Sequence, residues 1–188
     1  MGKLFYGTQS GMSVSVAEMI QIALPEWVDE IVDIGLAQAR DLQNEDFLVL
    51  GGGTFGAGEL TTDWDRFWPQ MDEVDFTDKK VALFAVGDAW AYGDTFCSVM
   101  RLFYKKVRER GGEIIGHGDP AESYKFRSSA SVINGVFIGA AIDEMNQSHL
   151  TYGRIARWAS SVREQLECTA VESTNPDSVV IISSLSAV

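Results

Sequence analysis

Small hydroxylated side chains follow the first apolar run of the chain. Residues 3–6 are expected to form a strand, and the segment 7–13 (GTQSGMS) comes directly after it, with hydroxyl groups at Thr8, Ser10 and Ser13. A helix pattern starts at the end of this segment, and a helix N-terminus offers unpaired N–H groups and a partial positive charge. The segment is therefore predicted to hold a phosphate group. A turn with an ordinary serine cap is the simpler alternative.

The composition of this segment also limits the kind of phosphate ligand. It contains no lysine, so it differs from the Gly-x-x-x-x-Gly-Lys-Ser/Thr loop of nucleoside triphosphatases. A site without lysine or Mg²⁺ ligands suits a monophosphate better than a triphosphate.

Two further loops carry aromatic side chains among small residues. The segment 51–60 is rich in glycine and carries Phe55, and the segment 87–97 carries Trp90 and Tyr92. A formal Gly-x-Gly-x-x-Gly match in the first of these does not open a helix, so a dinucleotide site is rejected there. Taken singly, each ring is more simply interpreted as a cap on the core. Together with the hydroxyl segment, they indicate a flat aromatic ligand that bears one phosphate.

The elements that would position these loops alternate along the chain. The apolar runs 46–50 and 80–86 are nearly continuous, which is typical of parallel strands covered on both faces. Alternating strands and helices predict an α/β fold with a doubly wound parallel sheet, whose ligands bind at the carboxyl ends of the strands. Strands are expected at 2–6, 27–32, 46–50, 80–86, 113–116 and 136–141, and helices at 13–24, 36–40, 63–73, 95–110 and 152–166.

The length and the net charge of the chain limit the class of protein. The 188 residues are expected to form one main domain, and no apolar run is long enough to span a membrane. No signal peptide is recognised at the start, so a cytoplasmic protein is expected. The formal net charge of −12 argues against nucleic acid and favours basic protein partners, although it also serves plain solubility. The two cysteines form no disulfide framework or metal-ligand spacing.

The three loops together resemble those of the flavodoxin family, of the long-chain type. Residues 8–13 (TQSGMS) are similar to the family's loop for the FMN phosphate. Residues 54–60 (TFGAGEL) resemble its Thr-Trp-x-x-Gly-Glu-Leu loop, and residues 87–96 resemble Gly-Asp-x-x-x-Tyr-x-Asp-Asn-Phe, whose Tyr stacks on the flavin. The stretch 124–148 is similar to the insertion and final strand of long-chain members.

This resemblance implies a fold, a domain organisation and a binding site. The sheet would have five strands, with the fifth interrupted by an insertion at about 118–136. The FMN-binding domain would cover 2–166, and 167–188 would be an extension whose apolar run 179–182 is an added strand, a partner-binding segment or disordered. The cofactor-binding residues implied are Thr8, Gln9, Ser10, Gly11, Met12, Ser13, Thr54, Phe55, Gly56, Ala57, Gly58, Gly87, Asp88, Trp90, Tyr92, Asp94, Thr95, Phe96, Cys97 and Asp143.

The function that the resemblance implies is one-electron transfer rather than catalysis. A family member holds FMN tightly but non-covalently and cycles it between semiquinone and hydroquinone at low potential. Nearby carboxylates would lower that potential by opposing negative charge on the flavin. The Gly56–Ala57 peptide is the expected site of a redox-linked flip. Three departures stand out: Phe55 replaces the commonest Trp, Trp90 lies in a changed loop, and Thr95 replaces Asn.

The implied partners are basic-surfaced redox proteins, such as a ferredoxin/flavodoxin–NADP reductase and an acceptor enzyme, and the chain is expected to be a monomer without nucleic acid or metal. Two other functions stay open. One is an NAD(P)H:quinone reductase of the same fold, and the other is a non-redox binding module that has lost FMN.

Overall fold

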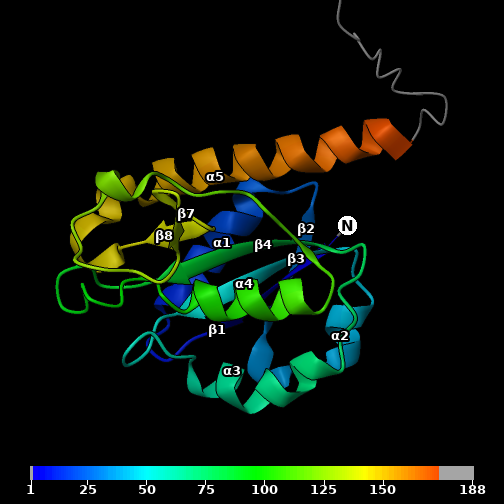
Figure 1. Cartoon of the computed structure of the whole chain (residues 1–188), viewed down its shortest axis with the longest axis horizontal. Coiled ribbons are helices and arrows are strands. Elements are labelled where there is room, and N and C mark those ends of the chain that lie inside the picture. Colours follow the sequence, from blue (N-terminus) through cyan, green and yellow to red (C-terminus); the bar gives the residue numbers. More distant parts are fainter. Residues whose placement is uncertain (1, 174–188) are drawn as a thin grey trace, which may run out of the picture.

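The computed structural model describes residues 2–173, which fold around one parallel sheet (Figure 1). Six strands fill five positions in this sheet, because two short strands share one edge. The order across the sheet is β2 (Val28–Asp33), β1 (Gly2–Gly7), β3 (Phe47–Gly53), β4 (Lys80–Val86) and then the edge formed by β5 (Glu113–Ile115) and β8 (Ala140–Ile142). The predicted doubly wound parallel sheet is confirmed.

The edge of the sheet is divided between β5 and β8. Residues 80–82 of β4 pair with β5, and residues 84–86 pair with β8, both in parallel. The 116–139 segment between them contains a 3₁₀ turn, η3 (Ala121–Ser123), and a small antiparallel pair, β6 (Val132–Ile133) and β7 (Val136–Phe137). The chain therefore leaves the sheet after β5 and returns to the same edge at β8.

The single strand predicted at 136–141 is wrong in its extent. Residues 136–137 belong to the small antiparallel pair, and only 140–142 join the main sheet. The amides of Phe137 and Ile138 donate to the carbonyls of Asp119 and Ser131, so this part of the backbone bonds within the 116–139 segment.

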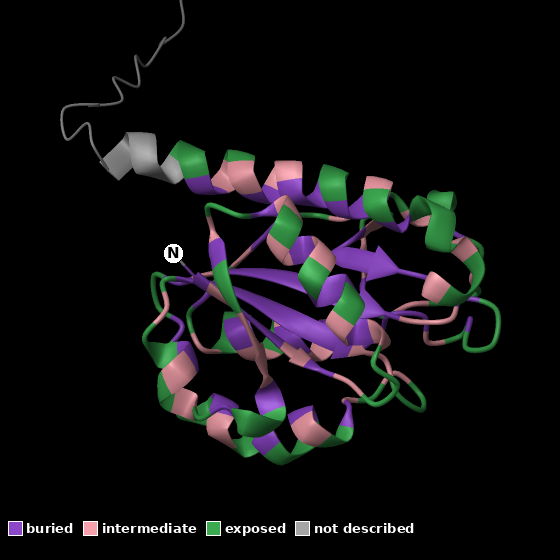
Figure 2. Ribbon diagram, turned by 180° about the vertical axis from the view of Figure 1, so that it is seen from behind, coloured by how far each residue is buried: buried purple, intermediate pink, exposed green. Residues whose placement is uncertain are grey.

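Helices cover both faces of the sheet (Figure 1). The long helices α1 (Met12–Ala23) and α5 (Glu144–Ser173) pack on one face with the even-numbered residues of β4. Helices α2 (Ala39–Gln43), α3 (Thr62–Phe67) and α4 (Met100–Glu109) pack on the other face with Val81, Leu83 and Ala85. Figure 2 shows the buried strands between these layers. Burial on both faces explains why the central strands are apolar without alternation.

Three helix boundaries differ from the predictions for local reasons. The helix expected from residue 95 begins at Met100, because Cys97 adopts a left-handed φ of 52°. The helix expected at 63–73 divides into α3 and a 3₁₀ segment, η2 (Trp68–Asp72), which has a proline in its first turn. The last helix begins at Glu144 rather than at residue 152, has a non-helical residue at Gln147, and continues past residue 166 to Ser173.

The short helix predicted at 36–40 is displaced in the structure. Residues 34–36 form a 3₁₀ turn, η1 (Ile34–Leu36), after β2, and α2 begins at Ala39 and continues to Gln43. Within residues 2–173, no helix combines the length and apolar character needed to cross a bilayer. The apolar run at 179–182 lies outside the described residues.

Candidate functional site

A cavity of about 350 Å³ opens at the carboxyl ends of β1, β3 and β4. All three loops singled out in the sequence contribute to its wall, together with the start of α5. Its volume falls within the range of small-molecule and cofactor sites. The lining residues are Gln9, Ser10, Met12, Ser13, Gly53, Thr54, Phe55, Thr61, Val86, Gly87, Asp88, Tyr92 and Met145.

The hydroxyl loop forms one end of this cavity at the N-terminus of α1. Gly11 is the residue before the helix and has a left-handed φ of 85°, and no side chain caps the helix. Thr8 turns inward on the loop, where its Oγ1 accepts from the Gly11 amide at 3.0 Å. Gln9 Nε2 donates to Thr62 Oγ1 at 2.8 Å, which ties the loop to the start of α3. The first turn of α1 thus presents uncapped N–H groups beside a buried Ser13, an arrangement that suits an anion.

Two buried hydroxyl groups in the cavity wall have no hydrogen-bond partner. They are the Oγ1 atoms of Thr54 and Thr61. An unsatisfied buried polar group costs about 1–3 kcal/mol, so each of these hydroxyls is a polar atom that the protein itself leaves unpaired. Sequence reasoning missed Thr61, because a threonine just before a helix reads as an ordinary cap. In the structure its side chain makes no capping bond.

Aromatic and thioether side chains also line the cavity. Phe55 is 51% exposed and Tyr92 is 60% exposed, although both rings are large and apolar. Both line the cavity, as does Met145 from the first turn of α5, which the sequence analysis did not identify. Exposed rings on two loops that line the same cavity provide surfaces that a flat ligand can cover.

The Phe55 loop is a tight turn held by its own backbone. The amide of Phe55 donates to the carbonyl of Glu59 at 3.0 Å, and the amide of Glu59 donates back at 2.7 Å. Between them lie Gly56, Ala57 and Gly58, and Gly56 has a left-handed φ of 47°. A side chain at this position would be strained, so glycine is needed for the observed turn.

Two carboxylates beside the cavity share one amide. Asn146 Nδ2 donates to Asp88 at 2.9 Å and to both oxygens of Asp143, at 2.9 and 3.1 Å. Burial acts to raise the pKa of Asp88, but hydrogen bonds from the Ala91 amide, Asn146 and the Trp90 amide together hold it below its usual value. The carboxylate of Asp88 therefore stays charged at the cavity wall.

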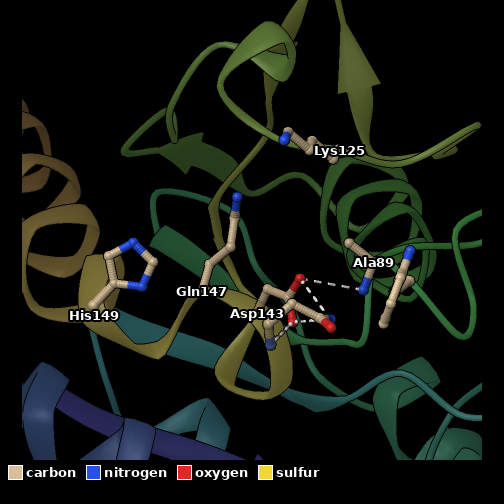
Figure 3. A pocket seen from close by; sticks show the side chains of 7 residues that line it. Ala89, Lys125, Asp143, Gln147 and His149 are labelled. Atoms are coloured by element: carbon tan, nitrogen blue, oxygen red, sulfur yellow. Dashed lines mark hydrogen bonds between the residues drawn. The ribbon is translucent and has the colours of Figure 1, made fainter.

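Asp143 faces a neighbouring hollow rather than the first cavity. It is almost fully buried, and its Oδ2 also accepts from the Ala89 amide at 3.3 Å (Figure 3). The second hollow has a volume of about 570 Å³ and is lined in addition by Trp90, Lys125, Asn146, Gln147 and His149. Trp90, which is 85% exposed, therefore borders this hollow and is not among the residues that line the first cavity.

Several of the implied site residues support the loops instead of lining the cavity. Phe96 is buried among the rings of Tyr124, Phe126 and Phe137. Cys97 is buried too; its thiol donates to the carbonyl of Ala85 at 3.5 Å, and burial raises its pKa.

Two other implied residues of the third loop, Asp94 and Thr95, are not among the residues that line the cavity. The amide of Thr95 donates to the carbonyl of Tyr92 at 3.0 Å, so Thr95 closes a turn. Asp94 forms an ion pair with Arg127. These contacts hold the backbone on which Tyr92 is carried.

Comparison with known proteins agrees with this geometry. The sequence profile of the family described as Flavodoxin matches residues 4–158. The chain is 40% identical over 163 residues to a flavodoxin from Synechococcus elongatus, covering 86% of this chain and 95% of that protein. It is 37% identical over 164 residues to flavodoxin 1 from Escherichia coli, covering 87% and 93%.

A solved structure has the same fold. The Fusobacterium nucleatum flavodoxin bound to flavin mononucleotide superposes with a TM-score of 0.82 at 29% identity, covering 87% of this chain and 97% of that one. The family profile spans most of the chain, the relatives match over nearly their whole length, and the three loops meet where the resemblance requires. This chain belongs to the flavodoxin family.

Proposed function

We propose that this protein is a one-electron carrier that binds FMN in the cavity at the ends of β1, β3 and β4. One observation carries the proposal: an uncapped helix N-terminus and two exposed aromatic rings border the same cavity. The FMN-bound state of the Fusobacterium relative supports the choice of ligand. When bound, FMN supplies one-electron redox chemistry.

The residues present fit such a ligand. Ser10, Ser13 and the first amides of α1 would hold the phosphate, because they combine hydroxyl donors with a helix N-terminus. The orphaned hydroxyls of Thr54 and Thr61 are shielded from solvent, so their side chains would rotate about χ1 to bond to oxygens of the phosphate and sugar chain. The flavin ring would lie between Phe55 and Tyr92. The residues that the resemblance implies for the site but that do not line the cavity would act by holding its loops in place.

The charges at the site favour a strong reductant. Asp88 and Asp143 are fixed by Asn146 close to the cavity. Added negative charge on a ligand is disfavoured near carboxylates, so reduction would be harder and the potential lower. After a rotation of the Gly56–Ala57 peptide, which glycine permits, the carbonyl of Gly56 would accept a hydrogen bond from an N–H group of the bound ring.

Domain limits and partners can be proposed for this protein as well. The FMN-binding unit would be residues 2–166, and 167–188 an extension outside it. A net charge of −12 suits transient encounters with basic-surfaced redox proteins, a reductase as donor and an enzyme as acceptor. We further propose that the protein is monomeric and cytoplasmic.

An anaerobic reductive titration of the purified protein tests the function. We expect tightly bound FMN and a stable one-electron-reduced form between the oxidised and fully reduced spectra. Direct two-electron reduction, together with steady-state oxidation of NAD(P)H by a quinone, would instead identify a quinone reductase. A protein that binds no added FMN would be a non-redox binding module.

A further inference from the structure

The 116–139 segment is hydrogen-bonded to the loop that carries Tyr92. Arg127 makes two hydrogen bonds to Asp94, from Nε to Oδ1 at 2.6 Å and from Nη2 to Oδ2 at 2.5 Å. The backbone amides of Arg127 and Ser128 both donate to the carbonyl of Gly93 at 2.8 Å. Four donors from one short stretch therefore meet two consecutive residues of the loop.

The same stretch also holds the other end of the loop. Ser131 Oγ donates to the carbonyl of Cys97 at 2.8 Å and accepts from the amide of Arg101 at 3.1 Å. The amide of Ala130 donates to Ser98 Oγ at 3.0 Å. Ser98 in turn lies against Gly58, where an added Cβ would come within 2.9 Å of the Ser98 Cβ. Both aromatic loops are thus braced from one side.

We propose that Arg127 is a positioning residue for the flavin site. It fixes the 87–97 loop and neutralises Asp94, so that Tyr92 is held at the cavity and a reduced ligand meets less electrostatic repulsion. The charge part of this inference rests on the proposed FMN function, whereas the loop part does not. Because the Arg127 and Asp94 side chains are 65% and 68% exposed, their ion pair contributes little to global stability. The ion pair should therefore act on the conformation of the loop and on the electrostatic potential near the cavity.

The expected size of the charge effect follows from chain geometry. Asp94 is two residues from Tyr92, so their backbones are at most about 7 Å apart. Two unit charges about 10 Å apart in water interact strongly enough to change a Kd by about twofold. By linkage, a twofold weaker binding of reduced than of oxidised FMN equals a potential about 18 mV more negative. This effect should shrink in 1 M salt, where the screening length is about 3 Å.

The test uses FMN-loaded and FMN-free protein with the variants Arg127→Gln, Arg127→Lys, Asp94→Asn and the Gln/Asn double variant. In the loaded protein at low ionic strength, we expect Arg127→Gln to make the potential of the second electron more negative by about 18 mV. Arg127→Lys and the double variant should stay near wild type, because each restores the charge balance. Lys106→Gln, which breaks an ion pair with Asp72 on another part of the surface, is the control.

Hydrogen exchange of the FMN-free protein tests the loop part separately. The amides of Tyr92, Thr95 and Ser98 are hydrogen-bonded inside the loop and should exchange about two- to fivefold faster in Arg127→Gln. Amides of the central strands should not change. Unchanged loop exchange, or a potential in Arg127→Gln equal to wild type, overturns the inference. If the protein binds no FMN, the proposed function fails, and hydrogen exchange still decides whether Arg127 positions the loop.

Discussion

Replacement of Thr61 by valine should stabilise the FMN-free protein and weaken FMN binding. The Oγ1 atom of Thr61 is buried in the cavity wall without a partner, and it makes no capping bond to α3. Valine has nearly the same shape and removes the oxygen. Because a buried unsatisfied polar group costs about 1–3 kcal/mol, we expect the free energy of unfolding of the FMN-free protein to rise by about 1 kcal/mol.

The effect on binding should have the opposite sign. A hydrogen bond to a charged group contributes about 1.5–3 kcal/mol, and a phosphate oxygen is such a partner. A loss of about 2 kcal/mol corresponds to a Kd about 30-fold higher. Thr54→Val should behave in the same way, because its hydroxyl is orphaned in the same wall.

Two measurements on the same variant check this reasoning. Urea unfolding of FMN-stripped protein gives the stability, and quenching of FMN fluorescence on titration gives the Kd. Thr77→Val is the control for binding and should leave the Kd unchanged, because Thr77 is exposed and precedes β4, at the end of the sheet away from the cavity. A Thr61→Val protein that is less stable without FMN, yet binds FMN as wild type does, would refute the assignment of this hydroxyl to the ligand.

Three further predictions concern the loops. Gly56→Val places a β-branched residue at a φ of 47° and should cost about 1–2 kcal/mol in the observed turn; less of the one-electron-reduced form should accumulate on reductive titration, and an unchanged yield contradicts the proposed flip. Phe55→Trp enlarges a half-exposed ring and should tighten FMN binding by about two- to fivefold in a fluorescence titration; equal or weaker binding would count against stacking at this position. The pKa of Asp88 is lowered in the folded protein, so its ionised form adds stability above its ordinary pKa of 3.8, and this stability is lost as pH falls below that value. The difference in the free energy of unfolding by urea between wild type and Asp88→Asn should be constant from pH 5 to pH 8 and shrink below about pH 4. A difference independent of pH would show that the carboxylate charge plays no part.

Local pattern explains how much of the fold was predictable. Continuous apolar runs identified the central strands, since β4 is buried on both faces by two different helical layers. Alternation of strands and helices then predicted the parallel sheet and the edge where its loops meet. Boundaries failed where a single residue changed the backbone course, as Cys97 does with its φ of 52° before α4.

The sequence alone determined the fold class, the three loops and the side of the sheet on which they meet, because spacing, turn residues and helix ends are local properties of the chain. Only the tertiary structure decided which polar atoms in those loops find a partner within the protein and which do not. The orphaned hydroxyl of Thr61, the amide of Asn146 shared between Asp88 and Asp143, and the Arg127–Asp94 clasp join residues far apart in the chain. Whether a polar atom finds a partner depends on packing in three dimensions, and no local pattern encodes it.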